Sequence, residues 1–308
     1  MTPRFLSGPV QVRVPATSAN LGPGFDALGL ALSLYDDLVA SIGVPGLAIT
    51  VTGEGADVAR DESHLVVSAM RATFDRLGGQ PGGLALACTN RIPHGRGLGS
   101  SAAAIVAGVV LARGLVVGGA DELPDADALD LAARIEGHPD NVAPCLLGGL
   151  TVAWADDERS HAVRRDCDPA ITPVVFIPPF QSSTKQARCL LPPSVPHADA
   201  ALTAGRAALL VAALTGSPEA LFAATEDRLH QQFRVSAMPE SGGLVAALRA
   251  SGHAAVISGA GPTVLVLTRD EVEVQQVRAC VPMDWECERL SIDEQGARIV
   301  VPGRAPDA

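Results

Sequence analysis

The sequence predicts an α+β fold of two domains, and three observations support this prediction. Several strand-like stretches, beginning with Val10–Val14, precede the first long helical stretch, and this order favours separate sheet and helix regions over repeated βαβ units. A charged turn at Asp156–Ser160 is followed by a second set of strands and helices. A chain of 308 residues with 47% hydrophobic residues is long enough to bury two cores. We therefore expect one domain at 1–160 and a second at 161–308.

The elements of the first domain follow from apolar periodicity and from glycine and proline stops. Alternation of apolar and polar residues predicts half-buried strands, and apolar residues three to four positions apart predict helices. Gly78 and Gly79 end the first helix, and Gly118, Gly119 and Pro124 separate the second helix from the third. In chain order we expect strands at Val10–Val14, Leu28–Val39 and Leu47–Thr52, a helix at Glu62–Leu77, a strand at Gly83–Thr89, helices at Ser101–Leu115 and Asp125–Ile135, and a strand at Gly148–Trp154.

The second domain is predicted from the same signals. Serine and threonine caps open a short helix at Ser182–Arg188. The turn Ser258–Pro262 joins two apolar strands, and its glycines allow the backbone to come close to a ligand or to the first domain. In chain order we expect a strand at Ile171–Ile177, helices at Ser182–Arg188, Ala198–Leu214, Pro218–Gln232 and Gly243–Ser251, antiparallel strands at Ala254–Ser258 and Thr263–Leu267, a helix at Glu271–Cys280, and strands at Trp285–Leu290 and Arg298–Val301 that complete the domain.

Composition and charge narrow the class of partner. A net charge of −11 argues against a general nucleic-acid or anionic-membrane surface, so we expect a small-molecule partner, no nucleic acid and no membrane. The six cysteines are scattered without a C-x-x-C pair, which predicts reduced thiols. The N-terminus lacks the apolar segment of a secretion signal, and the longest apolar run, Ala102–Ala112, is about half a membrane span. These features predict a cytoplasmic protein.

A glycine-rich stretch predicts a phosphate-binding loop directly ahead of a helix. Gly95, Gly97 and Gly99 allow positive φ angles, so that successive backbone N–H groups can converge on an anion. The following helix directs its free N–H groups toward the same point, and Ser100 and Ser101 offer hydroxyls to a phosphate or a metal. The loop is no dinucleotide fingerprint, because Ser100 occupies the last glycine position, and no Walker loop, because Gly99 stands in place of lysine. An ordinary glycine turn with a serine cap is the alternative.

Two further segments concentrate polar residues between glycines and prolines. Pro15–Asp26 holds small hydrogen-bonding side chains in a turn-rich loop, which either presents them to a ligand or only joins two strands. Glu136–Pro144 places two acids, an imidazole and an amide within six residues of a connector that is closed by prolines. This density is unusual for a connector and favours a site.

Taken together, these stretches resemble the three motifs of the GHMP kinases. The first motif is Pro15–Asp26, the second is Pro93–Ala103 and the third is Ser258–Pro262. The first motif, together with Glu136–Pro144 and Ser183–Arg188, is similar to the homoserine kinase branch of that superfamily. The resemblance covers nearly the whole chain.

The resemblance implies an activity, a fold and an assembly. The activity is ATP- and Mg²⁺-dependent transfer of the γ-phosphoryl group to the side-chain hydroxyl of L-homoserine, in threonine biosynthesis. The fold is α+β, with an N-terminal domain like ribosomal protein S5 domain 2, a C-terminal domain like an α/β plait, and nucleotide in the cleft. Members of the family are usually homodimers.

The resemblance also implies roles for individual residues. The residues that match the phosphate loop are Pro93, Gly95, Gly97, Leu98, Gly99, Ser100 and Ser101. The metal ligands would be Ser100 and Glu136. The residues near the reacting groups would be Glu136, Asp140, Asn141 and Thr184. The substrate-binding residues would be Asn20, Asp26, His138, Arg188 and Arg234. Asp140 would either accept a proton or orient the substrate through Asn141 and His138.

The chemistry of homoserine is consistent with these roles. A zwitterion needs a carboxylate or amide for its ammonium group, which Asp26 and Asn20 supply, and a guanidinium fork for its carboxylate, which Arg188 and Arg234 supply. Two alternatives stay open. One is another GHMP kinase that acts on mevalonate, a sugar or a diphosphocytidyl methylerythritol, although these substrates lack an ammonium group. The other is a nucleotide-binding relative without turnover, which would have no need of Glu136.

Overall fold

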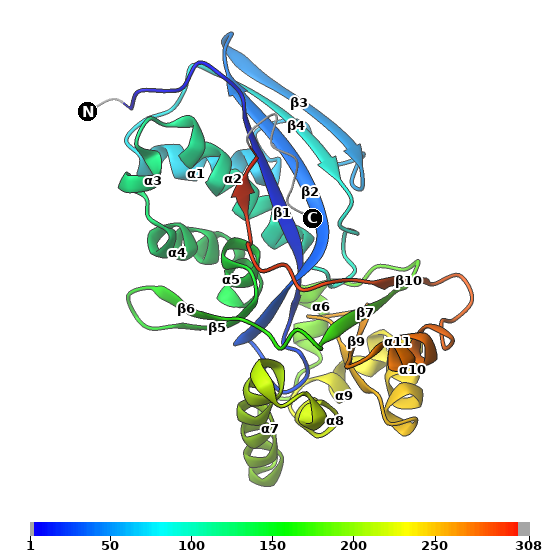
Figure 1. Ribbon diagram of the computed structural model, residues 1–308. Helices are drawn as coiled ribbons and strands as arrows, with labels where there is room; N and C mark the ends of the chain where they lie inside the picture. Colours follow the sequence, from blue (N-terminus) through cyan, green and yellow to red (C-terminus); the bar gives the residue numbers. More distant parts are fainter. Residues whose placement is uncertain (1–2, 301–308) are drawn as a thin grey trace.

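The first region of the molecule is a large sheet with helices on one face (Figure 1). The computed structural model describes residues 3–300, without the side chain of Thr184. Within this range a seven-stranded sheet has the order β11-β1-β2-β4-β3, and β5 pairs with both β2 and β6. Its strands are β1 (Val10–Ala19), β2 (Leu28–Ile42), β3 (Gly46–Gly53), β4 (Gly83–Asn90), β5 (Leu150–Ala155), β6 (Ser160–Arg165) and β11 (Arg298–Ile299).

The helices of this region pack beside the sheet and on one another (Figure 1). They are α1 (Leu65–Arg76), α2 (Ser100–Leu115), α3 (Gly119–Glu122), α4 (Asp125–Glu136) and α5 (Pro139–Leu147). α2 is the central one, and its run of Ala, Val and Gly is buried on nearly every side, as expected for a helix without a polar face. Gly108 lets α1 come close, because a Cβ at this position would lie 2.5 Å from the carbonyl oxygen of Val66. This packing fixes the N-terminus of α2, where the glycine loop ends.

The second region is a four-stranded antiparallel sheet with its own helices. The strand order is β10-β7-β9-β8, and α10 and α11 pack on the sheet through Leu244, Leu248, Val274 and Val277. The strands are β7 (Thr172–Ile177), β8 (Ala254–Ile257), β9 (Val264–Thr268) and β10 (Glu286–Arg289). The helices are α6 (Thr184–Cys189), α7 (His197–Gly216), α8 (Leu221–Ala224), α9 (Gln231–Arg234), α10 (Pro239–Ala250) and α11 (Glu271–Arg278), with 3₁₀ turns at Pro218–Ala220 and Val235–Ala237.

Most predicted elements are confirmed, but the two polar segments of the first domain differ from the prediction. β1 continues through Ala19, where we expected a loop from Pro15 onward. The strand accommodates proline because its pairing with β2 shifts register between Pro15 and Ala16. Residues 139–147, expected to be a connector, form α5. Pro139 stands at the first helical turn, where its missing N–H costs no hydrogen bond.

The second domain differs from the prediction in two places. The helix expected at Pro218–Gln232 is broken into a 3₁₀ turn, α8 and α9. α8 ends at Ala224, and the side chain of Asp227 accepts hydrogen bonds from the backbone N–H groups of Leu229, His230 and Gln231, which caps the start of α9. The strand expected to complete the second domain, β11, instead pairs with β1 in the first sheet. The charged turn at Asp156–Ser160 joins β5 to β6, and the resulting hairpin crosses the expected boundary at residue 160.

α7 has the length and composition of a membrane span, which the apolar runs of the sequence did not predict. It spans 20 residues with a mean hydropathy of 1.3 in its best window, of which 22% is buried. Leu210 and Leu214 from this helix are part of the main core. Part of its apolar surface therefore serves packing within the protein.

Candidate functional site

The three glycine-containing motifs meet at one point, between the two sheets. Gly95, Gly97 and Gly99 have φ angles of 66°, 80° and 72°, as the sequence predicts for a loop that turns its N–H groups to one side. The Thr17 N–H donates to the carbonyl oxygen of Leu98 at 3.0 Å, so a backbone hydrogen bond holds the loop against β1. Leu98 itself is fully buried. The first motif therefore supports the second.

The third motif closes on the same loop. Ser258 Oγ lies 2.6 Å from the carbonyl oxygen of Gly97 and 2.8 Å from Ser18 Oγ. A Cβ at Gly97 would lie 2.5 Å from the carbonyl oxygen of Ser258, so glycine is required for this approach. The predicted close approach of the third motif to the first domain is confirmed. Gly259, Ala260 and Gly261 also line the adjoining cavity.

Two cavities open on either side of the glycine loop. The first has a volume of about 360 Å³ and the second about 410 Å³. Gly95, Ser100 and Ser101 line both cavities, so the loop and the N-terminus of α2 lie where the two meet. Helix N-termini carry free N–H groups and a positive dipole end, which favour an anion at this junction. The arrangement can hold a long ligand with phosphates in its middle.

The first cavity gathers most of the predicted substrate and catalytic residues. Its lining includes Asn20, Asp26, Glu136, His138, Asp140, Asn141, Arg188 and Arg234. Pro93 lies elsewhere, in a smaller cavity between the two domains. Thr184 is the first residue of α6, and its side chain lies outside the described residues. Sequence reasoning thus assembled this part of the site from four separate segments of the chain.

An acidic and imidazole cluster lies beside the N-terminus of α2. Ser101 Oγ donates to Glu136 Oε2 at 2.7 Å, and His138 Nδ1 lies 2.5 Å from Asp140 Oδ1. The hydrogen bond with Asp140 raises the pKa of the His138 imidazole above its ordinary value. Burial raises the pKa of the Glu136 carboxyl, and the hydrogen bond from Ser101 counteracts part of this rise. Ser101, rather than Ser100, is thus the serine in direct contact with Glu136.

Asn141 and Asn20 connect the cavity to the surrounding backbone. Asn141 Oδ1 accepts from Thr17 Oγ1 at 2.8 Å. Asn20 Nδ2 donates to the carbonyl oxygen of Gly259 at 2.9 Å, and its Oδ1 accepts from the N–H of Asp26 at 2.9 Å. Both ends of the Asn20 amide are therefore engaged, which fixes the loop that carries Asp26.

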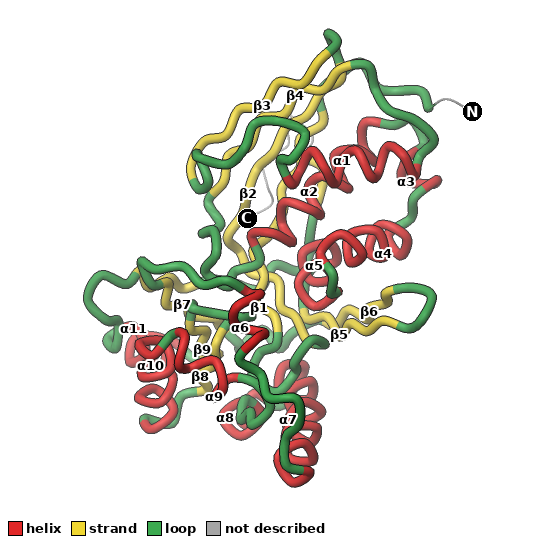
Figure 2. The backbone as a smooth tube through the Cα atoms, turned by 180° about the vertical axis from the view of Figure 1, so that it is seen from behind, coloured by secondary structure: helices red, strands yellow, loops and turns green. Residues whose placement is uncertain are grey.

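Asp26 and Arg188 form an ion pair that the sequence did not predict. Arg188 NH1 and NH2 donate to the two carboxylate oxygens of Asp26 at 2.9 and 2.6 Å, a bidentate pair between the first domain and α6. This pairing raises the pKa of Arg188. In Figure 2, α6 lies between the N-terminal helices and the lower helices α8 and α9, where Arg188 reaches the cavity. Both side chains are about one third exposed, at 37% each, so they remain accessible.

Arg234 is the opposite case. Only 1% of its surface is exposed, and it forms no ion pair with a carboxylate within residues 3–300. Its NH1 donates to the carbonyl oxygen of Gly259 at 3.2 Å, while Nε has no hydrogen-bond partner in the described part of the chain. Burial lowers the pKa of Arg234, and the positive charge of Arg188 adds to this effect. A buried cation of this kind is favourable for binding an anion.

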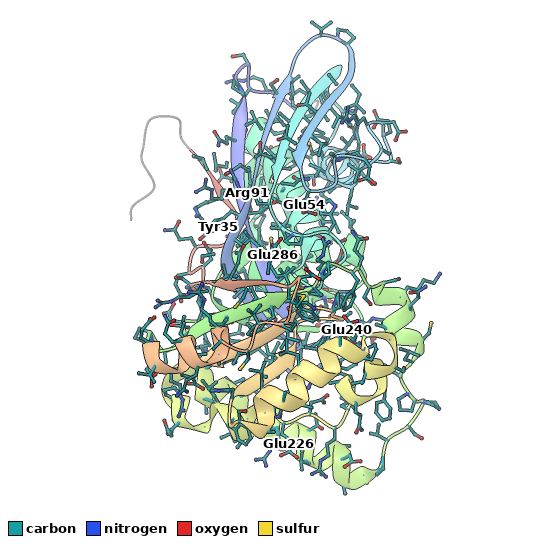
Figure 3. The ribbon with its side chains drawn as sticks, turned by 90° about the vertical axis from the view of Figure 1, so that its right-hand side faces the viewer. Tyr35, Glu54, Arg91, Glu226, Glu240 and Glu286 are labelled. Carbon is teal, nitrogen blue, oxygen red and sulfur yellow. The ribbon has the colours of Figure 1, made fainter. Side chains whose placement is uncertain are left out.

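Arg96 connects the glycine loop to the second domain. Its Nε and NH2 donate to the carbonyl oxygens of Pro178 and Pro179 at 2.9 and 3.0 Å. Figure 3 shows Glu54 and Glu286 close to this junction, one from each domain, and both line a cavity with Arg96. Arg96 thus faces the junction between the two domains.

Comparison with known proteins identifies the family. Residues 64–149 match the GHMP kinases N terminal domain, and residues 200–286 match the GHMP kinases C terminal family. A homoserine kinase of Streptomyces coelicolor is 57% identical over 306 residues, which are 99% of this chain and 99% of that protein. The chain belongs to the homoserine kinase family of the GHMP kinases.

Other similarities agree with membership of the homoserine kinase family. A homoserine kinase of Clavibacter michiganensis is 51% identical, and the match covers 97% of this chain and 97% of that protein. The crystal structure of homoserine kinase from Cytophaga hutchinsonii has a TM-score of 0.81 at 25% identity, covering 96% of this chain and 99% of that one. L. major mevalonate kinase has a TM-score of 0.70 at 15% identity, with coverage of 96% and 99%, which shows the shared fold alone. The predicted two-domain GHMP kinase fold is confirmed, whereas the roles of individual side chains stay predictions.

Sequence reasoning missed most of the second cavity of this homoserine kinase family member. Apart from the glycine-loop residues Gly95, Ser100 and Ser101, the predicted site includes none of the residues that line it. Leu65 and Val66 of α1 are among its apolar lining residues. The residues that were missed come from β2, the segment before α1, β4 and the loop after it, and α2; they include Asp36, Leu38, Val58, His64, Cys88, Asn90 and Ala104. No motif marks them, because each follows the ordinary pattern of its own strand or helix. Asp36 differs from the other residues of this set because it is a buried acid. Its carboxylate accepts hydrogen bonds from the N–H groups of Arg91 and Ile92 at 2.6 and 2.9 Å.

Proposed function

We propose that this protein transfers the γ-phosphoryl group of ATP to the side-chain hydroxyl of L-homoserine, forming O-phospho-L-homoserine in threonine biosynthesis. The observation that carries the assignment is the charge arrangement of the first cavity. Arg234 is buried there without a carboxylate partner in residues 3–300, and the Asp26–Arg188 pair lies beside it. A zwitterionic amino acid offers a carboxylate to the arginines and an ammonium group to Asp26. Membership in the homoserine kinase family supports the same substrate.

Binding of homoserine changes the partners of Asp26 and Arg188. In the structure, the two side chains satisfy each other through the bidentate pair. The substrate ammonium group takes one oxygen of Asp26, and the substrate carboxylate binds between Arg188 and Arg234. The exchange replaces one internal pair with two pairs to the ligand, and Asn20 holds the loop of Asp26 during this exchange.

ATP extends across both cavities. The phosphates bind to the N–H groups of the glycine loop and to the first turn of α2, and the base and ribose occupy the second cavity. Gly95, Ser100 and Ser101 support this path because they line both cavities. Leu65, Val66 and Ala104 give the base an apolar environment.

Mg²⁺ fits the donor set beside the loop. Glu136 offers one carboxylate, and Ser100 and Ser101 offer hydroxyls, with 2.7 Å between Ser101 Oγ and Glu136 Oε2. Protein sites for Mg²⁺ with nucleotides use one or two carboxylates together with phosphates and waters, so a single glutamate suffices. When bound, the ion neutralises charge on the transferring phosphates.

The residues near the substrate hydroxyl act mainly by position. Phosphoryl transfer passes through a loose transition state, in which alignment and charge neutralisation dominate. The raised pKa of His138 favours its imidazolium form, which suits stabilisation of negative charge better than acceptance of a proton. Asp140 holds His138 through a hydrogen bond and either accepts the proton of the hydroxyl or orients the substrate. Asn141 lines the same cavity as Asp140, and the role of Thr184 near the reacting groups stays a prediction from the family resemblance.

A substrate screen tests the assignment. ADP release is measured with homoserine, mevalonate, a panel of sugars and a diphosphocytidyl methylerythritol as acceptors, at saturating ATP and Mg²⁺. We expect turnover with homoserine at a kcat/KM at least about a hundredfold above the others, because they lack the ammonium group that Asp26 binds. Preference for mevalonate or a sugar would replace the substrate assignment, and absence of turnover with every acceptor would favour a non-catalytic relative.

A cytoplasmic homodimer is part of the same proposal and is supported by the family resemblance. α7 qualifies as a membrane span by length and composition, but Leu210 and Leu214 pack into the core. Fractionation of expressing cells, followed by light scattering of the purified protein, tests both points. Recovery from the membrane pellet, or the mass of a monomer, would contradict them.

A further inference from the structure

Arg234 is held by neutral groups, and His230 is one of them. Arg234 NH1 lies 3.2 Å from His230 Nδ1 and 3.2 Å from the carbonyl oxygen of Gly259. His230 is completely buried, and its Nε2 lies 2.7 Å from the carbonyl oxygen of Gly22. His230 therefore connects the guanidinium to the loop that precedes Asp26.

The partners of His230 determine its tautomer. A carbonyl oxygen only accepts hydrogen bonds, so Nε2 must donate to Gly22. A guanidinium only donates, so Nδ1 must accept from Arg234. The neutral form with its proton on Nε2 is the one state that satisfies both contacts. Burial lowers the pKa of His230, which favours the same neutral form.

The aromatic ring of Phe25 links this contact to the substrate cavity. It stacks on His230 with a centroid distance of 4.9 Å. The guanidinium carbons of Arg234 and Arg188 lie 5.3 and 5.7 Å from its centroid. The ring is thus in contact with both arginines that the proposed function assigns to the substrate carboxylate, and Asp26 follows it directly in the chain.

Four charged groups surround His230. Asp227, in the turn before α9, lies 3.6 Å from Nε2, but its Oδ2 already accepts from the N–H groups of His230 and Gln231. Arg234 on α9 contacts Nδ1, and the carboxylates of Asp227 and of Asp26 in the first domain oppose part of the lowering of the His230 pKa by burial. Arg188 on α6 lies over the same Phe25 ring.

The two arginines of the cavity are therefore prepared in different ways. Arg188 is neutralised by Asp26 until the substrate arrives, whereas Arg234 keeps its full charge because its partners are an imidazole and a carbonyl oxygen. We propose that His230 is a positioning residue for substrate recognition: as a neutral acceptor, it fixes Arg234 toward the substrate carboxylate without cancelling its charge. This inference rests on the proposed function, since it assigns the carboxylate of homoserine to Arg234.

A pair of isosteric variants separates position from charge. In His230→Asn, a neutral amide oxygen can accept from Arg234 near the position of Nδ1; in His230→Asp, a carboxylate of the same shape pairs with Arg234 and cancels its charge. We expect the KM for homoserine to rise by no more than about threefold in His230→Asn and by about tenfold or more in His230→Asp, with the KM for ATP unchanged in both. His230→Leu, which leaves the guanidinium without its acceptor, should also raise the KM for homoserine about tenfold.

Each outcome of this experiment bears on the proposal. Equal homoserine KM values for the Asn and Asp variants, or a parallel rise in the KM for ATP, would overturn it, since a merely structural role predicts no difference based on charge. If His230→Asp fails to fold, as judged by its thermal transition, the comparison of Asn with Leu decides, and equal values contradict the role of the acceptor. Wild-type turnover with homoserine is measured in the same series, so its absence would overturn the proposed function instead.

Discussion

The two cavities of the cleft recognise their ligands by different physical means. The first contains a partly exposed ion pair between Asp26 and Arg188 and, at Arg234, a buried guanidinium that pairs with no carboxylate of residues 3–300. The second combines the apolar side chains of Leu38, Val58, Leu65, Val66 and Ala104 with polar ones, and no arginine or lysine of the described chain lines it. Charge therefore selects the ligand at one end, and shape and apolar burial select it at the other. The glycine loop belongs to both ends, so damage to the loop should affect both ligands, whereas changes at either end should affect only one.

Gly99→Val damages the part that both cavities share and has the largest expected effect. Gly99 has a φ angle of 72°, and a Cβ there would overlap with Thr17 Oγ1, the hydroxyl that donates to Asn141. The loop has to shift, so we expect ATP binding to be abolished while the fold is largely retained. Titration with a fluorescent ATP analogue and far-UV circular dichroism measure the two quantities.

Gly118→Val is the matched control for this change. Gly118 also has a left-handed φ angle, 78°, but no atom lies within 4 Å of the position that a Cβ would take there. The substitution therefore introduces the backbone strain without the contact at Thr17. Equal loss of ATP affinity in both variants would mean that strain, and not the geometry of the loop, explains the effect.

Arg234→Leu tests the charged end alone. Charge-assisted hydrogen bonds contribute about 1.5–3 kcal/mol each, so the KM for homoserine should rise by about one to two orders of magnitude while the KM for ATP holds. Arg234→Lys should recover only part of the affinity for homoserine that Arg234→Leu loses, because an ammonium group lacks the planar fork of a guanidinium. Steady-state kinetics with each substrate varied separately is the measurement.

Arg249→Leu controls for the loss of a partly buried arginine. Arg249 donates to Thr225 Oγ1 and the carbonyl oxygen of Phe222 and lies outside both cavities. Its replacement should lower the thermal stability without a change in either KM. If Arg234→Leu weakens ATP and spares homoserine, Arg234 belongs to the nucleotide end of the cleft.

Glu136→Gln tests the metal at the junction. The charge is removed at constant size, so half-maximal activity should require about tenfold more Mg²⁺.

The pH dependence has a defined sign: burial raises the pKa of Glu136, so the carboxylate protonates, and activity falls, as the pH decreases through that raised value. The glutamine variant should lack this acidic limb. An unaltered Mg²⁺ requirement, measured beside the remote variant Glu122→Gln, would move the metal ligand elsewhere.

Ala104→Leu fills the apolar end and has the smallest expected effect. Ala104 on α2 lines the second cavity, and the added carbons reduce the space for the base. We expect the KM for ATP to rise about three- to tenfold with no change in the KM for homoserine. Ala208→Leu, on the exposed side of α7, is the control for the substitution itself. A rise in the KM for homoserine would show that the two ends are not independent.

The comparison also explains which parts of the site could be predicted from the sequence. The charged end is built largely from segments in which polar residues lie between glycines and prolines. This composition is unusual, so each such segment can be recognised in the sequence by itself. The apolar end uses residues such as Val66 and Ala104, which cannot be distinguished from core residues by periodicity. Its location becomes visible only when β2, β4 and α2 are packed together.

Contacts between distant segments were the other limit of prediction. The Asp26–Arg188 pair joins residues 162 positions apart, and the sequence assigned opposite tasks to the two side chains without placing them in contact. His230 was not a candidate, because its role depends on Gly22 and Phe25 from the first domain. α5 was missed for a local reason: Pro139 and Pro144 indicate a connector, yet the first is compatible with a helix start.

The central claim is that the charged end recognises an amino acid through Asp26. The most direct measurement is the ratio of kcat/KM for homoserine to that for 4-hydroxybutyrate, which keeps the hydroxyl and carboxylate but lacks the ammonium group. It is determined for the wild-type protein and for Asp26→Asn. We predict that the ratio strongly favours homoserine in the wild type and falls by about tenfold or more in the variant, because one charge-assisted contact is lost. A ratio that is the same in both proteins would contradict the account.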